Sequence, residues 1–351
     1  MEGSIINSFM AFVFSCLCIG AFKPISKKAG LTDSPCERKL HEGKIPLIGG
    51  ISIYCALLIV YILTDSAPNG AIFLSAVTLL VFVGMIDDRS PLPIKYRLLT
   101  QIAATGIMIY FADVQYHHLG NLFNSGQVEL GSIAPLFTII AVVGTINAFN
   151  MMDGIDGLCS GVSVVALTFL LFITSSNQLS SAINVTALIF CLLAYMIFNL
   201  QMFGKRIEKI FMGDAGSMLI GFSIAWLLAE TTQAENAPIS PAMAVWVIAL
   251  PLMDMGAIMI RRIMKGQSPF QADRNHLHHI LLRAGFSHRK ALLIMLILAA
   301  GLTGIGYTAY INGASDWELL CLWWGAFTFY TLAISHGWRT SKIIRLIRER
   351  S

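Results

Sequence analysis

The sequence predicts an all-α fold: a polytopic membrane helix bundle of about eleven transmembrane helices, with the N-terminus outside and the C-terminus in the cytoplasm. Three observations predict it. Of the 351 residues, 56% are hydrophobic and 13% are charged, whereas a soluble domain has roughly 25% charged residues. Eleven apolar runs are each long enough to cross a hydrocarbon core of about 30 Å. The basic residues between these runs segregate to one side, so residues 1–351 are expected to form a single integral membrane domain.

The predicted spans leave no room for a soluble domain between them. In chain order they cover residues 4–22, 45–64, 69–86, 97–112, 133–149, 160–175, 182–199, 214–231, 240–260, 291–310 and 317–336. The first run could be mistaken for a secretory signal peptide, but it lacks a basic leading region and a small-residue cleavage site, and Lys23 follows it directly. We therefore expect it to remain as a helix.

The basic residues orient the predicted bundle. With eleven spans and an outside N-terminus, all 24 Lys and Arg residues lie on the cytoplasmic side, as the positive-inside rule requires. The cytoplasmic segments are residues 23–44, 87–96, 147–159, 200–213 and 261–290, and a basic tail covers 337–351. The net charge of +4 is thus concentrated on one face, where it attracts anionic lipids and anionic substrates.

The first polar cluster in the chain follows the third span, where Asp87 and Asp88 are adjacent and Arg89 comes next. Two neighbouring carboxylates at a helix C-terminus are unfavourable, because they repel each other and because that end of the helix dipole is negative. Arg89, Lys95, Arg97 or a divalent cation could offset this cost. A raised pKa on one Asp would make it a general base, and the alternative is a solvated helix end.

The second cluster lies between the fifth and sixth spans, over residues 147–158. It contains Asn147, Asn150, Asp153, Gly154, Asp156 and Gly157. Ionisable groups at the mouth of a membrane segment usually mark a substrate or ion site. Asp153 and Asp156 are three residues apart, so a helical turn would place both on one face, and the glycines would leave the other face open. The alternative is a helix-ending turn in which these residues only cap.

Three single charged residues lie at or within spans. Lys44 precedes a Gly- and Pro-containing entry to the second span and is available for a phosphate, although an ordinary helix-entry turn explains it equally. Asp214 opens the eighth span, where it could face a cation or act as a plain N-cap. Asp254 lies within the ninth span after Pro251 and needs a partner there, and we expect a structural role for it.

The largest cytoplasmic loop carries three imidazoles in four residues. The relevant residues are Arg262, Arg274, His276, His278 and His279. Such a group could bind zinc or an oligophosphate. Zinc favours a closed set of three or four ligands that often includes thiolates, and the loop offers no nearby thiol. Phosphate binding through the imidazoles and the arginines therefore fits better.

Taken together, these motifs resemble those of the polyprenyl-phosphate N-acetylhexosamine-1-phosphate transferases. The likeness rests on Asp87-Asp88-Arg89, the stretch over 147–158, the segment over 211–217 that contains Asp214, and the His-x-His-His sequence over 276–279. It spans Pro46 to His279 and all eleven predicted helices. The His motif resembles the WecA-type branch, which uses UDP-N-acetylglucosamine. Leu277 stands where Ile is frequent, and this departure leaves the imidazole spacing intact.

The resemblance implies a magnesium-dependent phosphotransferase, with Mn²⁺ able to substitute, whose active site is formed by the cytoplasmic segments. Undecaprenyl phosphate would attack the β-phosphorus of UDP-N-acetylglucosamine, giving undecaprenyl-diphospho-N-acetylglucosamine and UMP. By motif match, Asn150 and Asp214 would hold the metal, and Asp87 and Asp88 would orient or deprotonate the lipid phosphate. Asp156 and Asn199 would lie near the uracil, and His276, His278, His279 and Arg262 would bind the diphosphate and sugar. Further candidate substrate-binding residues are Asp153, Lys44, Lys95 and Arg97.

The resemblance also implies a setting. The protein would be a multi-pass protein of the bacterial cytoplasmic (inner) membrane, with its active site on the cytoplasmic face. It would perform the first lipid-linked step of a cell-surface polysaccharide, of the O antigen of lipopolysaccharide or of the enterobacterial common antigen type. Its partners would be the two substrates and the bilayer, with no nucleic acid, and a homo-oligomer is compatible with the sequence.

Two alternatives to this function remain. A related transferase could use another UDP-N-acetylhexosamine. A secondary transporter would also combine many spans with membrane-embedded acids, but its site would lie near the bilayer midplane at an interface between repeats. Here the acids gather at one rim, only Asp254 is deep, and no repeat is apparent.

Overall fold

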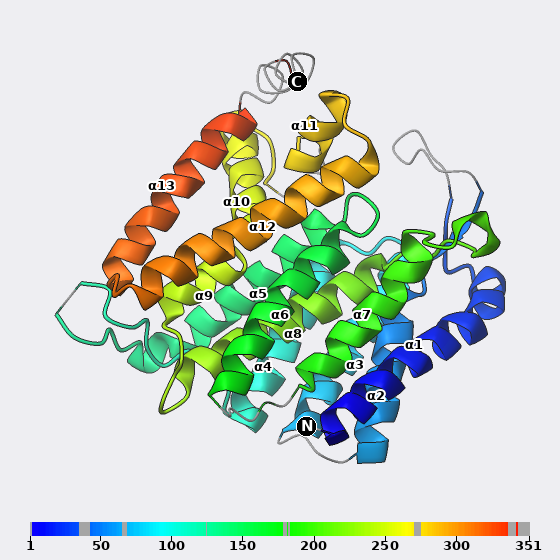
Figure 1. Cartoon of the computed structure of the whole chain (residues 1–351), viewed down its shortest axis with the longest axis horizontal. Helices are drawn as coiled ribbons and strands as arrows, with labels where there is room; N and C mark the ends of the chain where they lie inside the picture. Colours follow the sequence, from blue (N-terminus) through cyan, green and yellow to red (C-terminus); the bar gives the residue numbers. More distant parts are fainter. Residues whose placement is uncertain are drawn as a thin grey trace. The chain divides into compact units, whose positions relative to one another are not determined.

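The computed structural model describes residues 2–34, 43–64, 69–123, 125–177, 181, 183–269, 275–335 and 342, with the backbone alone for residues 2–5 and 205. Within these residues the chain is mostly helical (Figure 1). The loop predicted over 23–44 is described only in part. Arg274 and, apart from Lys342, the basic tail over 337–351 lie outside the described residues. The chain divides into two compact units.

The first unit comprises Met1–Tyr116, Ser132–Ile146 and Leu167–Pro238. Its complete helices are α1 (Glu2–Ala29), α2 (Gly49–Thr64), α3 (Gly70–Arg89), α4 (Ile94–Ala112), α7 (Val185–Asn199) and α8 (Gly213–Gln233). It also holds the first part of α5 (Ala134–Met152), the second part of α6 (Leu158–Ser176), the 3₁₀ turn η2 (Gly204–Arg206) and an antiparallel pair of short strands, β1 (Thr32–Asp33) and β2 (Ile45–Pro46). A second 3₁₀ turn, η1 (Gly131–Ile133), precedes α5.

Helix α8 forms the core of the first unit. Its residues are apolar or small almost throughout, and nearly all of them are buried, as expected for a helix that is hydrophobic all round. Helices α2 and α3 pack against it. In the middle of α8, Phe222 and Trp226 form an aromatic cluster with Phe73 of α3, in which the Phe73 and Trp226 rings are 5.5 Å apart and edge to face. These contacts fix α3 and α8 side by side.

The second unit comprises His117–Gly131, Asn147–Ala166 and Ile239–Ser351. Its complete helices are α9 (Pro241–Val247), α10 (Ala249–Met264), α11 (Leu277–Arg283), α12 (His288–Ile311) and α13 (Asp316–Ser335). Figure 1 shows α12 and α13 running to the short turn that joins them. Helices α10 and α13 pack together, and α9 contacts both α12 and α13.

A sharp bend of 81° separates α9 from α10. Pro251 causes it, because its ring has no N–H to donate and clashes with the carbonyl four residues earlier, which belongs to Val247 at the end of α9. The carbonyls of Trp246 and Val247, at the break between the two helices, accept hydrogen bonds from the hydroxyl of Thr303 in α12, at 3.3 and 3.5 Å. The predicted ninth span is therefore a bent pair of helices.

Every predicted span coincides with a helix or, for the ninth, with this bent pair. Within the described part of the chain, seven helices are long and apolar enough to cross a membrane, or eight if the bent pair counts as one span. The apolar helices α2 and α7 are shorter, at 16 and 15 residues, and α4 begins with Lys95 and Arg97 in its first turns. The protein is thus a multi-pass membrane protein, and the number eleven stays a prediction.

Candidate functional site

The first unit gathers three carboxylates where α3 ends and α8 begins. Asp88, in the last turn of α3, accepts hydrogen bonds from the backbone N–H groups of Asp214 at 2.7 Å and Ala215 at 3.3 Å. It therefore caps α8, whose own N-cap residue Met212 makes no side-chain bond. The sequence left open that Asp214 acts as the N-cap of this helix. In the structure the capping side chain is that of Asp88, 126 residues away along the chain.

Gly213 makes this approach feasible. Its φ is +73°, a conformation that favours glycine. A Cβ at this position would also collide with the carboxylate of Asp88. The sequence Met-Gly-Asp at the start of α8 therefore turns the chain and leaves room for a carboxylate from α3.

Arg97 joins the other two carboxylates. Its guanidinium lies 3.2 Å from Oδ2 of Asp87 and 3.8 Å from Oδ2 of Asp214. Oδ1 of Asp87 accepts a hydrogen bond from the backbone N–H of Leu92 at 2.6 Å, whereas its buried Oδ2 has no hydrogen-bond partner. One arginine is therefore shared by two carboxylates, and the negative charge left over favours a bound cation.

Backbone pairing fixes the segment that leads into α8. The N–H of Phe211 donates to the carbonyl of Pro46, and the N–H groups of Gly49 and Gly50 donate to the carbonyls of Phe211 and Met212, all at 2.9 to 3.0 Å. The residues that lead into α2 are thus hydrogen-bonded through their backbone to the residues just before Asp214. Lys44 lies one residue before β2 and is exposed.

Two other predicted site residues of the first unit, Asn199 and Lys95, are not among the residues that make these backbone hydrogen bonds. Asn199, at the end of α7, is buried, and its amide donates to the carbonyl of Ile210 at 2.9 Å. Lys95 is exposed, with its ammonium 5.0 Å from the centre of the Tyr96 ring.

The second unit carries the asparagine and aspartate stretch, and the helical turn predicted for it is wrong. Helix α5 ends at Met152 and α6 starts at Leu158, so Asn150 lies in the last turn of α5, while Asp153 and Asp156 lie in the connection. Glycine is a poor helix former, and Gly157 has a φ of +74°, which helices do not allow. Asp153 is exposed, and Asn150 and Asp156 are half-buried.

The three imidazoles of the His motif, which belongs to the second unit, form one cluster. The ring centres of His276 and His278 are 5.5 Å apart in a stacked arrangement, and those of His278 and His279 are 4.2 Å apart. The ring of His278 also lies against Gly154, where a Cβ would overlap its Nε2. The Gly154 connection and the His motif are therefore neighbours within this unit.

His278 is a neutral group. Burial lowers its pKa to about 3, with a further lowering by the charge of His279. Neither of its ring nitrogens has a hydrogen-bond partner in the described structure. His278 therefore offers hydrogen bonds rather than positive charge.

Arg262 and Asp254 both lie on α10, and both are buried. The guanidinium of Arg262 donates to the carbonyl of Pro269 at 2.5 Å, which anchors the start of the following loop. Asp254 contacts His276 and Tyr330. Tyr330 is absent from the sequence predictions, because nothing distinguishes it from the other tyrosines in apolar spans.

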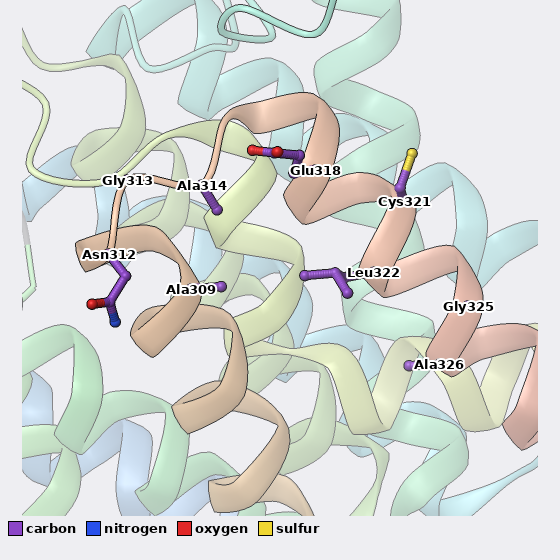
Figure 2. Close-up of a pocket in the computed structure, with 9 residues that line it drawn as sticks. All are labelled: Ala309, Asn312, Gly313, Ala314, Glu318, Cys321, Leu322, Gly325 and Ala326. Carbon is purple, nitrogen blue, oxygen red and sulfur yellow. The ribbon is translucent and has the colours of Figure 1, made fainter.

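An open groove in the described structure lies away from these motifs. It has a volume of about 910 Å³ and lies between the end of α12 and the start of α13 (Figure 2). Glu318 contributes a charged side chain to its lining and Asn312 an amide, and small residues such as Gly325 and Ala326 line much of the rest. None of the predicted site residues lines this groove, so it is not the candidate site.

The predicted site residues thus fall into two sets. Lys44, Asp87, Asp88, Lys95, Arg97, Asn199 and Asp214 belong to the first unit, and Asn150, Asp153, Asp156, Arg262, His276, His278 and His279 belong to the second. Among the described residues, no group of three or more His, Cys, Asp or Glu side chains is arranged to hold a metal. Mg²⁺ does not require such a group, since it is commonly bound by one or two carboxylates with substrate phosphates and water. The carboxylates around Arg97 fit that ion.

Comparison with known proteins gives one consistent result. Residues 71–232 match the model of glycosyl transferase family 4. The chain is 42% identical over 342 residues to the undecaprenyl-phosphate alpha-N-acetylglucosaminyl 1-phosphate transferase of Escherichia coli, covering 97% of this chain and 93% of that protein. The proteins of the same name from Yersinia pestis and Haemophilus influenzae are 40% and 37% identical, with 97% and 99% of this chain and 93% and 98% of those proteins covered.

Proposed function

The chain belongs to the undecaprenyl-phosphate alpha-N-acetylglucosaminyl 1-phosphate transferases, and we propose that it transfers N-acetylglucosamine-1-phosphate from UDP-N-acetylglucosamine to undecaprenyl phosphate. An oxygen of the lipid phosphate forms a bond to the β-phosphorus, and the bond from that phosphorus to the bridging oxygen breaks. The products are undecaprenyl-diphospho-N-acetylglucosamine and UMP. The identity of 37 to 42% over nearly the full length carries this proposal.

The carboxylate cluster supports this reaction. Phosphoryl transfer depends on positioning and charge neutralisation more than on covalent chemistry. We assign Asp214 and Asn150 to Mg²⁺, which when bound neutralises charge on the diphosphate. Asp87, whose Oδ1 is held by the backbone N–H of Leu92 and whose Oδ2 forms the ion pair with Arg97, orients the lipid phosphate. A phosphate with a second pKa of about 6 is largely ionised at pH 7, so it requires little help from a general base.

Asp88 takes a different role from Asp87. Both of its oxygens accept hydrogen bonds from the start of α8, which makes it a group that positions Asp214. Asp153, Asp156 and Asn199 are assigned to the nucleotide. His276, His278, His279 and Arg262, with Lys44, Lys95 and Arg97, are assigned to the diphosphate, the sugar and the lipid phosphate. The assignments of Asp156, Asn199, the three histidines and Arg262 rest on the motif match, and those of Asp153, Lys44, Lys95 and Arg97 rest on their charge and their position beside the motifs.

The setting belongs to the same proposal. The site faces the cytoplasm of a bacterial inner membrane, because all 24 basic residues lie on one side of an eleven-span arrangement. The product then enters synthesis of a cell-surface polysaccharide. A related enzyme that uses another UDP-N-acetylhexosamine is the alternative, and a comparison of transfer from the two UDP-sugars decides between them.

The test is transfer of label by the purified full chain. Protein in detergent with undecaprenyl phosphate, Mg²⁺ and sugar-labelled UDP-N-acetylglucosamine should yield butanol-extractable label, and omission of the lipid should abolish it. A parallel reaction with UDP-N-acetylgalactosamine measures sugar selectivity. A cooperative thermal unfolding transition shows that the protein is folded. If such protein gives no extractable label with any UDP-sugar, the proposed activity is refuted.

A further inference from the structure

A buried carboxylate in α10 has no part in the chemistry described so far. Asp254 is 1% exposed and accepts three hydrogen bonds. Nδ1 of His276 lies 2.6 Å from its Oδ2, the hydroxyl of Tyr330 donates to its Oδ1 at 2.7 Å, and the backbone N–H of Leu277 donates to the same oxygen at 3.2 Å. All four residues belong to the second unit. A carboxylate in a membrane segment is costly, so this complete set of partners calls for a reason.

The pairing fixes the chemical form of His276. An ionised carboxylate only accepts hydrogen bonds, so Nδ1 of the imidazole must carry a proton. In the neutral ring, the unshared electron pair then lies on Nε2, because the bond made by one nitrogen determines the state of the other. Asp254 thus determines which nitrogen of His276 can accept a proton or a hydrogen bond from a substrate.

The same carboxylate also fixes the backbone of the His motif. His276 is the N-cap residue of α11 and makes no side-chain cap bond, and the N–H of Leu277 donates to Asp254 instead. Helix α11 carries His278 and His279. Tyr330 holds Oδ1 from α13, which leaves Oδ2 to His276. The ring and the peptide of one histidine are therefore both bound to α10.

We propose that Asp254 is a positioning residue for His276: it holds the imidazole in the Nδ1–H form and directs Nε2 to the diphosphate or sugar of the substrate. The assignment of the substrate rests on the proposed function. Asp254→Asn keeps an oxygen that can accept from Leu277 and Tyr330 and changes the group that faces Nδ1, so its effect on turnover should pass through His276.

A double-mutant cycle on turnover tests this dependence. The asparagine of Asp254→Asn has the same size but can donate as well as accept. It should lower kcat/KM about ten- to hundredfold, the usual effect of losing the partner that orients a functional histidine. In a chain that already carries His276→Ala, the same change should alter kcat/KM by no more than about twofold. Equal losses in both backgrounds would show that Asp254 acts independently of His276, and would overturn the proposal.

A matched control uses Glu230, which also lies on an apolar helix and accepts hydrogen bonds from neutral donors, Trp226 at 2.7 Å and Ser181 at 2.5 Å. Glu230→Gln should leave kcat/KM unchanged if the effect at Asp254 is specific. Tyr330→Phe removes a donor to the other oxygen of Asp254 and should cost less than Asp254→Asn. A loss for Glu230→Gln as large as that for Asp254→Asn would assign the effect to general helix packing.

A spectroscopic measurement keeps the proposal independent of activity. The ¹⁵N resonances of His276, assigned by their loss in His276→Ala, should show a protonated Nδ1 in the parent chain and a different tautomer population in Asp254→Asn. If the parent chain shows Nε2 protonated and Nδ1 bare, the proposal fails even where transfer is observed. If no UDP-sugar is transferred but the tautomer is as expected, the proposed function fails and the pairing stands.

Discussion

The carboxylate of Asp88 and the backbone N–H of Asp214 form a hydrogen bond of 2.7 Å between the end of α3 and the start of α8. The bond joins two motifs separated by 126 residues, and it ties the backbone of Asp214 to the end of α3. It also gives adjacent aspartates different tasks, because Asp87 is bound to Leu92 and Arg97 instead.

Two substitutions of Asp88 distinguish a role as the cap of α8 from a role as a general base. Asp88→Asn keeps an oxygen that can accept from the N–H of Asp214 and should retain most of the thermal stability. Asp88→Ala should lower the free energy of unfolding by about 0.5 to 2 kcal/mol, the usual cost of losing a cap. Thermal unfolding of both variants in detergent measures this. A general-base role would instead give two inactive variants of unchanged stability.

Asp214 should behave as a metal ligand with no effect on the helix. Asp88 already supplies the cap, so Asp214→Asn should unfold at the same temperature as the parent chain. The same substitution should raise the Mg²⁺ concentration needed for half-maximal transfer, because an amide oxygen is a weaker ligand than a carboxylate. Titration of activity with Mg²⁺ is the measurement. An unchanged titration curve would remove Asp214 from the metal site.

Gly154 should be intolerant of any side chain. A Cβ there would overlap the ring of His278, so Gly154→Ala should displace the His motif and reduce transfer strongly. Gly301→Ala in α12 is the matched control, because no heavy atom lies within 4 Å of a Cβ at that position. It should leave activity intact and stabilise the helix by up to about 1 kcal/mol. Equal losses in the two variants would contradict the assigned contact.

His278 should make the fold sensitive to acid. Its pKa is lowered to about 3 in the folded chain from 6.5, so between these values the unfolded chain binds the proton and the folded chain does not. Stability therefore rises with pH across this window and is lost as pH falls. His278→Gln should flatten the decline in thermal stability between pH 6.5 and pH 4. A decline as steep as that of the parent chain would show that other groups cause it.

The positions of the helices could be predicted, because a long apolar run is sufficient to specify a buried or lipid-facing helix. The proline at position 251 indicates a kink, but the size of the bend could not be predicted, since it depends on tertiary contacts such as the hydrogen bonds from Thr303 to the carbonyls of Trp246 and Val247. The spacing of Asp153 and Asp156 suggested a helical face that Gly157 excludes.

The residues of the candidate site could also be predicted from the sequence, but the role of each residue could not. Whether Asp214 caps its own helix depends on Asp88, which the chain brings to it through the packing of α3 on α8. Tyr330 could not be found from the sequence, because its role consists of a single contact to Asp254.

The most direct test of the account is the fate of the β-phosphorus. UDP-N-acetylglucosamine labelled with ³²P at the β-position and ³H in the sugar should give a lipid product that carries both labels in the ratio of the substrate, with unlabelled UMP released. Lipid that carries ³H without ³²P would mean transfer of the sugar alone and release of UDP. That result would contradict phospho-sugar transfer.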